Sequence, residues 1–362
     1  MPIEYPRTGG LIAEHKAVRG GVGVFDVSHM GDVRVRGRSL AAGLAAVEHI
    51  TMNDVSRLAM GQAEYSAMLY PEGTFVDDLI VHRLGEDDFL LVINAGTREK
   101  DVAWIRENTK SFDCEVIDLS DAYTQLAIQG PRAADVLRRL GYAAAAELPS
   151  YWFAYGAICG LSDVLMARTG YTGEDGFEIY IPSDMETSEN VWRSVLEAGR
   201  EFGILPCGLG ARNTLRLEAR LPLYGHEISQ DINVWEAGLG RFCKMEKGEF
   251  VGRSALAGLK STVARRLVGL EMIDRGIARD GYPCQNMEGQ VIGKVTSGSP
   301  SPTLGKNIAL AYLPLDLAEL GTVVYVEIRG QKLKAQVVPT PFYRRRKSEE
   351  SGSSERHSSG KR

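Results

Sequence analysis

The chain has 362 residues, 44% of them hydrophobic and 25% charged, with a formal net charge of -5. Because single cores rarely grow beyond about 250–300 residues, we expect two or three domains. The acidic balance argues against general nucleic-acid binding, which needs a basic face. No apolar run approaches the ~20 residues of a membrane span, and no signal-peptide core opens the chain, so we expect a cytoplasmic protein without a membrane partner.

The first 260 residues mix helical and extended patterns. Asp32 to Arg36 alternates strictly, as a half-exposed strand does, and Ser39 is expected to cap the apolar helix that follows. We expect helices at residues 11–19, 39–49, 131–140 and 187–202, with two more beginning at residues 97 and 210. We expect strands at residues 32–36, 65–70, 76–83, 89–94, 114–119, 125–128, 164–168 and 177–181. This mixture of helices and antiparallel strands predicts an α+β protein.

After Arg265 the pattern changes to short strands separated by Gly, Pro and Ser. We expect these strands at residues 267–272, 291–296, 308–313, 323–328 and 333–338. They predict an all-β terminal domain. Beyond Tyr343 the sequence consists of polar residues and glycine with nothing apolar to bury, which predicts a disordered tail.

Motifs for several other chemistries are absent. The five cysteines lie far apart without a Cys-x-x-Cys pair, so buried free thiols in a reducing compartment are the simplest interpretation. The six histidines lack metal-ligand spacing, and we expect no metal. Gly298 to Lys306 has neither the glycine spacing nor the Ser or Thr of a phosphate loop.

Two adjacent acids lie in the apolar segment Val76-Asp77-Asp78-Leu79-Ile80-Val81. Neighbouring strand residues point to opposite faces, so at most one of the two carboxylates enters a given pocket. An acid on the inward face is costly without a partner or a ligand. The alternative is that both acids cap the Gly73-Thr74 turn, and the pair alone leaves both interpretations open.

A glycine-rich loop, Gly170-Tyr171-Thr172-Gly173-Glu174-Asp175-Gly176, leads into a strand that begins with Phe177-Glu178. Such tight turns are common, so a purely structural role stays open. Glu178 alternates with Phe177, however, and can face a cavity. A carboxylate there can accept two parallel N–H bonds from a guanidine-like edge.

A third segment runs from Cys207 through Gly208-Leu209-Gly210 to Ala219. Glycines that lead into a helix leave its backbone N–H groups free for an anion, and Arg212 adds positive potential. The alternative is a surface network between Arg216 and Glu218 that binds no ligand.

Together and in this order, these segments resemble the T-protein (aminomethyltransferase) family of the glycine cleavage system along nearly the whole chain. The other segments that carry the resemblance are Phe25-Asp26-Val27-Ser28-His29-Met30, Tyr65-Ser66, Val92-Ile93-Asn94-Ala95, Glu99-Lys100-Asp101, Gln129-Gly130-Pro131, Leu223-Tyr224-Gly225, Thr296-Ser297-Gly298, Ser301-Pro302-Thr303-Leu304-Gly305 and Pro341-Phe342-Tyr343.

The resemblance implies an α+β fold in which three domains form a cloverleaf around a central channel. Two domains are mixed α+β and discontinuous, and the third is a C-terminal all-β, barrel-like domain. The expected units are residues 1–28 with 114–208, residues 29–113 with 209–260 as the folate-binding unit, residues 261–345, and a disordered tail at 346–362.

The implied activity is transfer of a methylene group from the aminomethyl-lipoyl arm of a lipoylated H-protein to tetrahydrofolate, with release of ammonia. Tetrahydrofolate is then a co-substrate, and the lipoyl group belongs to the partner. The resemblance also implies that Asp78 is the catalytic carboxylate. Its fixed negative charge would stabilise iminium character and orient the attacking nitrogen. Asp77 is the structural member of the pair. Glu178 is implied to bind the amino-pyrimidinone edge of the folate, and the implied site is completed by Met30, Tyr65, Asn94, Tyr171 and Arg212.

Two other folate-binding groups are the alternatives. The non-catalytic folate-binding protein of iron–sulfur cluster assembly carries Lys-Gly-Cys-Tyr-x-Gly-Gln, whereas Lys247-Gly248-Glu249-Phe250-Val251-Gly252-Arg253 lacks the cysteine. Dimethylglycine and sarcosine dehydrogenases carry a flavin domain whose glycine fingerprint is absent here. Asn213 and Arg241 depart from the Asp and Trp common in the T-protein family. Loss of the Trp ring costs about 1 kcal/mol of stacking unless Arg241 stacks instead.

Overall fold

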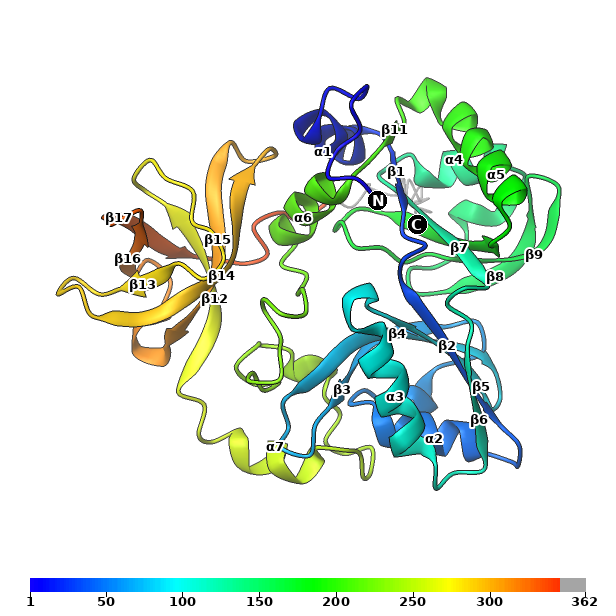
Figure 1. The fold of residues 1–362 in the computed structure, drawn as a ribbon, viewed down its shortest axis with the longest axis horizontal. Coiled ribbons are helices and arrows are strands. Elements are labelled where there is room, and N and C mark those ends of the chain that lie inside the picture. The colour runs from blue at the N-terminus through cyan, green and yellow to red at the C-terminus, as the bar shows by residue number, and fades with distance from the viewer. Residues whose placement is uncertain (346–362) are drawn as a thin grey trace, which may run out of the picture.

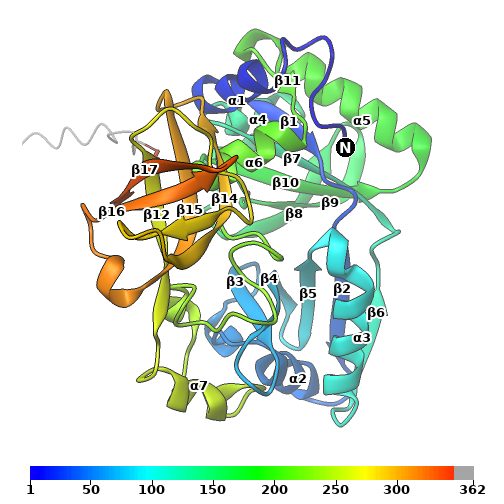
Figure 2. The ribbon, with the colours of Figure 1, turned by 60° about the vertical axis from the view of Figure 1, so that its left-hand side comes forward.

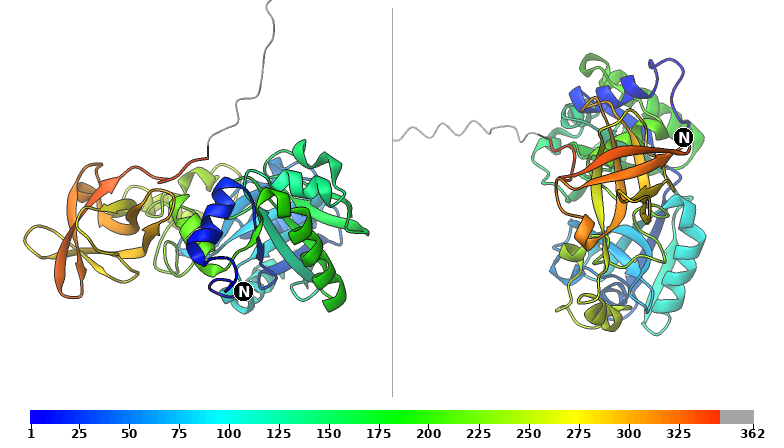
Figure 3. Two further views of the ribbon diagram at one scale, coloured as in Figure 1. Left: turned by 90° about the horizontal axis from the view of Figure 1, so that it is seen from above. Right: turned by 90° about the vertical axis from the view of Figure 1, so that its left-hand side faces the viewer.

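Two α+β units and a β-barrel surround a common centre in the computed structural model, which describes residues 1–345 (Figure 1). The barrel lies to one side of the two sheets, and the helix α6 (Leu209–Glu218) lies near the centre between them. Seen from above, the barrel and the two sheet units extend along one long axis (Figure 3). The expected α+β cloverleaf is confirmed, while the tail expected at 346–362 falls outside the described residues.

The first unit contains a six-stranded sheet in the order β11-β1-β7-β10-β9-β8. All neighbouring strands are antiparallel except β1 and β11. Its strands are β1 (Gly23–Asp26), β7 (Tyr123–Gln129), β8 (Phe153–Ile158), β9 (Leu161–Ala167), β10 (Gly176–Pro182) and β11 (Leu205–Pro206). Its helices are α1 (Leu11–Gly20), α4 (Ala133–Arg139) and α5 (Met185–Ala198). Ile128 and Phe177 of the sheet pack with Val136 of α4 and Val195 of α5 in one apolar core.

The second unit contains an antiparallel five-stranded sheet in the order β3-β4-β5-β2-β6. Its strands are β2 (Gly31–Gly37), β3 (Ala63–Leu69), β4 (Phe75–Gly85), β5 (Asp88–Ile93) and β6 (Cys114–Asp118), and its helices are α2 (Ala42–Ile50) and α3 (Arg98–Thr109). Strand β6 pairs with β2, from Val33 opposite Asp118 to Gly37 opposite Cys114. The expected domain boundary between residues 113 and 114 therefore cuts through this sheet, and the sheet continues to Asp118.

The third unit is a closed barrel in the order β12-β15-β14-β13-β16-β17. Its strands are β12 (Arg265–Met272), β13 (Pro283–Gln285), β14 (Val291–Ser301), β15 (Lys306–Pro314), β16 (Val323–Ile328) and β17 (Gln331–Val338). Leu270, Val295, Ala311 and Val326 are buried in its interior. The helix α7 (Arg253–Leu259) and the segment after it lead from the second unit into the barrel (Figure 2).

The beginning of α6 is covered by the N-terminal segment of the same chain. The backbone N–H groups of Leu209 and Gly210 donate to the carbonyl oxygens of Pro2 and Ile3, both at 2.8 Å. The N–H of Gly208 donates to Oε2 of Glu14 at 2.9 Å. Of the two interpretations left open for this segment, the anion site at these glycines is contradicted, because protein acceptors already use the N–H groups.

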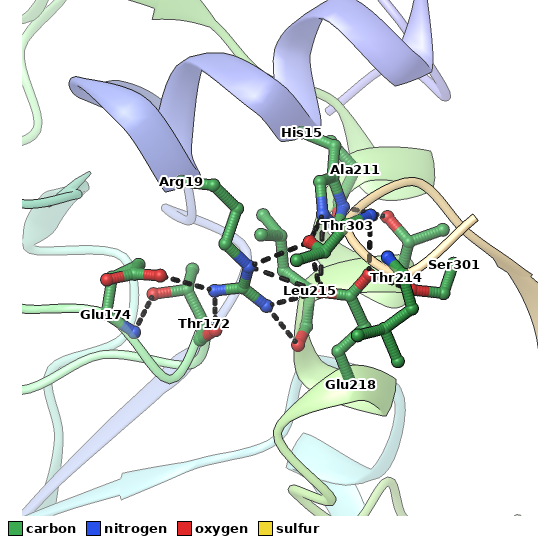
Figure 4. A network of polar contacts seen from close by, with 11 residues as sticks. His15, Arg19, Thr172, Glu174, Ala211, Thr214, Leu215, Glu218, Ser301 and Thr303 are labelled. Carbon is green, nitrogen blue, oxygen red and sulfur yellow. Dashed lines mark hydrogen bonds and ion pairs between the residues drawn. The ribbon is translucent and has the colours of Figure 1, made fainter. Parts of the chain in front are cut away.

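A buried polar network joins α6 to both neighbouring units (Figure 4). The Arg19 guanidinium of α1 lies 2.8 Å from Glu218 Oε2 and 2.9 Å from Glu174 Oε1. From the barrel, Ser301 Oγ donates to Glu218 Oε1 at 2.5 Å. Burial disfavours the Glu218 carboxylate, but hydrogen bonds and charges from His15, Ser301 and Arg19 outweigh burial and lower its pKa to about 2.

The alternative interpretation, a surface network between Arg216 and Glu218, is contradicted as well, because both side chains are buried. Arg216 is 1% exposed, and its Nη1 lies 2.5 Å from Oε2 of the fully buried Glu227. Arg216 Nη2 also donates to Ser297 Oγ of the barrel at 2.8 Å. The two charged residues thus anchor α6 through separate buried networks.

Candidate active site

All seven candidate site residues line one pocket between the two sheets and α6. The empty space in and around the pocket is about 710 Å³, a value that includes space open to solvent. The five-stranded sheet contributes Tyr65 of β3 and Asp78 of β4, and the six-stranded sheet contributes Glu178 of β10. The other four candidate residues in the lining are Met30, Asn94, Tyr171 and Arg212.

The carboxylate of Asp78 is held at both oxygens by its neighbours. Tyr65 donates from its hydroxyl to Oδ2 at 2.9 Å, and Asn94 donates from Nδ2 to Oδ1 at 2.8 Å. Tyr65 lies on the adjacent strand, opposite Ile80 in the register, and Asn94 follows the end of β5. Pairing of β3, β4 and β5 therefore brings three separate segments together around one carboxylate.

The charge of Asp78 depends on pH near neutrality. Burial, followed by the nearby charge of Asp77, raises the pKa of Asp78 to about 7, while hydrogen bonds from Asn94 and Tyr65 act in the opposite direction. An acid on the inward face was expected to need a partner, and Tyr65 and Asn94 are the partners of Asp78.

Asp77 is fully buried and is not part of the pocket lining. Its Oδ1 accepts from the backbone N–H of Asp78 and from Nδ2 of Asn94, both at 2.8 Å, and its Oδ2 accepts from Thr97 Oγ1. These bonds replace the expected alternative in which the acids cap the Gly73-Thr74 turn. One carboxylate of the pair faces the pocket, and the same Asn94 amide contacts both.

Glu178 and Arg212 place opposite charges in the pocket wall. Thr169 Oγ1 donates to Glu178 Oε2 at 2.5 Å, and burial raises the pKa of Glu178. The Arg212 guanidinium lies 4.5 Å from the centroid of the Tyr171 ring, and burial lowers its pKa. Tyr171 is in turn fixed by donation from its hydroxyl to the carbonyl of Pro222. A ligand with an N–H edge and an acceptor group could satisfy both charges.

Sequence reasoning missed several other lining residues. They are Leu79, Ile80, Val92, Tyr151, Thr169, Gly170, Leu221 and Pro222. Thr169 directly precedes the glycine-rich loop, and its position there was the available signal. Tyr151 has a φ of 61°, a conformation that bulky residues rarely adopt, and no sequence pattern marks it.

The two departures from the family pattern have partners within the protein. The Arg241 guanidinium lies 4.5 Å from the centroid of the Phe242 ring, and Phe242 makes an edge contact with Tyr65 at 4.8 Å between centroids. Asn213 Oδ1 accepts from Arg216 Nε at 2.9 Å. Arg241 therefore packs beside an aromatic pair that reaches the pocket.

Residues 1–345 contain neither a cluster of metal-ligating side chains nor a membrane-spanning helix. That part of the chain has no group of three or more His, Cys, Asp or Glu side chains arranged to hold a metal ion. No helix within it is long and apolar enough to cross a membrane.

Comparisons with known proteins agree with this architecture. The family model described as the GCVT N-terminal domain matches residues 1–247, and the glycine cleavage T-protein C-terminal barrel domain matches residues 265–344. The aminomethyltransferase of Acidobacterium capsulatum is 64% identical over 354 residues, covering 96% of this chain and 91% of the relative. That of Koribacter versatilis is 61% identical over 348 residues, with the same coverage of 96% and 91%.

A solved structure shows the same fold. The crystal structure of the glycine cleavage system aminomethyltransferase T from Bartonella henselae superposes with a TM-score of 0.87 at 35% sequence identity. The match covers 95% of this chain and 91% of that chain. The likeness therefore extends over both α+β units and the barrel.

Proposed function

The chain belongs to the glycine cleavage T-protein family and is an aminomethyltransferase, and we propose that tetrahydrofolate binds in the pocket between its two sheets. The observation that carries this proposal is the meeting of Asp78, Glu178 and Arg212 in one pocket, although they come from three different parts of the chain. A few polar groups that converge among apolar side chains, as they do here, are typical of a site for an organic co-substrate.

In the proposed reaction, a lipoylated H-protein presents an aminomethyl group bound to sulfur. The methylene carbon forms bonds to two folate nitrogens, while its bonds to sulfur and to the amine nitrogen break. The products are methylenetetrahydrofolate, ammonia and the dihydrolipoyl carrier. The two protons that the folate nitrogens lose balance those gained by the ammonia and the thiol.

Asp78 is the proposed catalytic residue. When ionised, it stabilises the positive charge that develops on the methylene and amine groups as sulfur leaves. Its bonds with Tyr65 and Asn94 fix its direction before the substrate arrives, so little reorganisation is needed during the reaction. With a pKa of about 7, it is also suited to receive a proton from a folate nitrogen near neutral pH.

Glu178 and Arg212 are the proposed residues that bind the pteridine ring of the folate. The Glu178 carboxylate can accept N–H bonds from the amino-pyrimidinone edge, with Thr169 holding one oxygen in place. Arg212, stacked on Tyr171, provides the donor groups. Met30 contributes apolar surface from a cluster that contains Val92.

We also propose that the partner protein is the lipoylated H-protein and that the reaction takes place in the cytoplasm. A cytoplasmic location is supported by the five cysteines, all of which are unpaired in the structure, as expected where thiols stay reduced. The alternative of a non-catalytic folate-binding protein is not favoured, since the curated relatives with up to 64% identity are aminomethyltransferases.

The decisive experiment measures methylenetetrahydrofolate formation from aminomethyl-loaded H-protein with and without this chain. We expect turnover that requires tetrahydrofolate, together with folate binding measured by titration calorimetry. Tight folate binding without turnover would instead favour the non-catalytic alternative. Absence of both would contradict the proposed pocket.

A further inference from the structure

Arg220, the second residue after α6, combines two unfavourable features at one position. Its backbone has a φ of 55°, a conformation that residues other than glycine rarely adopt. Its Nε is buried without a hydrogen-bond partner in residues 1–345, and its Nη2 reaches the carbonyl oxygen of Ala237 only at 3.4 Å. Local strain and unused buried donors cluster at functional sites, so this side chain is a candidate for binding a ligand.

No carboxylate of residues 1–345 neutralises this guanidinium. The ion pairs in that part of the chain include neither Arg220 nor Arg241. Glu227, an acid whose charge acts on Arg220, already pairs with Arg216 at 2.5 Å. A ligand that carries negative charge is the partner that both free guanidinium groups lack.

Arg220 and Arg241 meet at one turn of the chain. Arg241 lies in the short 3-10 helix Gly240–Phe242, and Arg220 contacts the residues directly before that helix. A Cβ built on Gly238 would lie 2.9 Å from Arg220 Nη2, so the absence of a side chain there leaves room for the guanidinium. Two unneutralised positive charges therefore converge on this turn from different segments of the chain.

The same turn lies beside the pocket. The Arg241 guanidinium packs on the Phe242 ring, 4.5 Å from its centroid, and the Phe242 ring lies 4.8 Å from that of Tyr65 in the pocket wall. The two residues that directly follow Arg220 also line the pocket. Arg241 itself is exposed. The two arginines therefore lie between the pocket wall and solvent, where a ligand's protruding end would pass.

The charges of the site favour a ligand with two different ends. Asp78 and Glu178 are carboxylates of the pocket wall, and they suit a head group that presents N–H donors. Arg220 and Arg241, outside the wall, suit a tail that presents carboxylates. Tetrahydrofolate has this polarity, because its pteridine head carries N–H groups and its other end carries one or more glutamates joined through their γ-carboxyl groups.

We propose that Arg220 and Arg241 bind the glutamate tail of the folate and select a tail of several glutamates over a tail of one. The inference rests on the proposed function, because it requires the folate head to lie against Glu178. It goes further by naming the form of the co-substrate and the two residues that select it. Arg241 stands where Trp is common in the T-protein family, so this chain places a charge where a ring is usual.

Four variants separate charge from fold. Arg220→Gly removes the guanidinium, and glycine adopts a φ of 55° without strain. Arg241→Trp removes the charge and supplies the ring common in the family, whereas Arg241→Lys keeps the charge. Arg275→Gln is the matched control for the loss of one positive charge, because Arg275 is exposed and absent from the pocket lining.

The measurement is anaerobic titration calorimetry with tetrahydropteroate, which lacks glutamate, and with tetrahydrofolate that carries one or three glutamates. For the wild type, Arg275→Gln and Arg241→Lys, we expect the triglutamate to bind roughly three- to tenfold more tightly than the monoglutamate. This ratio should shrink when salt is raised from about 0.05 M to about 0.3 M. In the double variant Arg220→Gly/Arg241→Trp we expect a ratio near one, with the affinity for tetrahydropteroate unchanged.

Three outcomes would overturn the proposal. They are a wild-type ratio near one, a double variant that keeps the wild-type ratio, and a double variant that loses the same affinity for all three ligands. The last outcome would show that the arginines act through the fold rather than on the tail. A wild-type protein that binds none of the three ligands would instead contradict the proposed folate pocket, so the two failures are distinguishable.

Discussion

At the scale of single residues, the pocket concentrates groups whose ionisation is opposed by burial. Asp78 and Glu178 both have raised pKa values, and Arg212 has a lowered one, with burial as the largest cause in each case. Such groups are unfavourable for an empty pocket and become favourable when a ligand supplies complementary charge and hydrogen bonds. Function and stability therefore make opposite demands on these three side chains.

Substitution of Asp78 by Asn tests the catalytic assignment. The amide keeps the shape of the side chain but removes its charge, so transition-state stabilisation is lost while the folate contacts remain. We expect kcat to fall by about 10²–10³-fold or more, with the folate dissociation constant within about threefold. Wild-type turnover in Asp78→Asn would exclude Asp78 as the catalytic group.

The same variant has a predictable effect on stability. Because the pKa of Asp78 is raised from 3.8 to about 7 in the folded state, the folded protein binds this proton more tightly than the unfolded chain does. Stability from this group is fully present below about pH 4 and is lost as pH rises through 7. Above pH 7, Asp78→Asn should therefore melt roughly 2–4 °C higher than the wild type. Thermal melts of both proteins at pH 5 and pH 8 measure this difference. A melting temperature of Asp78→Asn below that of the wild type at pH 8 would contradict the prediction.

Glu178 is the residue with which to test folate binding. Glu178→Gln replaces one acceptor oxygen with a donor that faces the ligand's N–H groups, so an unpaired buried group results. We expect the dissociation constant for tetrahydrofolate to rise about tenfold or more. Glu186→Gln, an exposed acid on α5, serves as the control. An unchanged dissociation constant in Glu178→Gln would remove this residue from the proposed site.

At the scale of elements, much of the secondary structure was predictable and its ends were not. The strands β4, β14 and β17 were expected near their observed positions. Four short strands, β1, β8, β11 and β13, were missed because sheet pairing rather than local pattern defines them. Ser39 does not cap α2, which begins at Ala42, and Asp87 instead accepts from the backbone N–H of Leu44 at 2.6 Å.

The candidate site was predictable in a different way. The residues came from a family resemblance, because alternation alone left the roles of Asp77, Asp78 and Glu178 open. The missing information is three-dimensional: the Asn94 amide bridges two acids, and Thr169 holds Glu178. Neither contact leaves a periodic signal. The covering of the α6 N-terminus by Pro2 and Ile3 is equally non-local.

That covering explains why glycine stands at the start of α6, and it can be tested. A Cβ on Gly208 would lie 2.4 Å from the carbonyl oxygen of Ile3, so Gly208→Ala must displace the N-terminal segment. We expect a loss of about 1–3 kcal/mol in the free energy of unfolding. Gly258→Ala is the control, because its Cβ meets nothing within 4 Å and alanine favours the helix α7. Urea denaturation of both variants measures the difference, and equal stabilities would contradict the packing argument.

At the scale of the whole molecule, the three units are held together by polar contacts that converge on α6. Glu218 receives bonds from Arg19 of the first unit and from Ser301 and Thr303 of the barrel. It also contacts His15, with 3.3 Å between Oε2 and Nε2. Because α6 carries Arg212 as well, the same helix that positions a pocket residue also fixes the barrel against the sheets.

The contacts of Glu218 with Arg19, Ser301 and Thr303 form a junction between the units, and the lowered pKa of Glu218 makes this junction sensitive to acid. Its folded-state pKa of about 2 lies below the ordinary value of 4.5, so its contribution to stability is present above pH 4.5 and is lost as pH falls from 4.5 toward 2. Glu218→Gln should therefore lower the free energy of unfolding by about 1–3 kcal/mol at pH 7. The gap from the wild type should narrow below pH 4.5, where the unfolded wild-type chain binds a proton at Glu218 while the folded protein still holds the ionised carboxylate.

Urea titrations at pH 7 and pH 3.5 measure this gap, with Glu319→Gln, an exposed acid near the barrel strand β16, as the control. A gap that stays constant with pH would mean that Glu218 acts through packing rather than through its charge. We also expect Glu218→Gln to weaken the free energy of folate binding by less than it lowers the free energy of unfolding. Glu218 supports the helix that carries Arg212 but is absent from the pocket lining. The junction thus transmits its effect to the site through the position of α6.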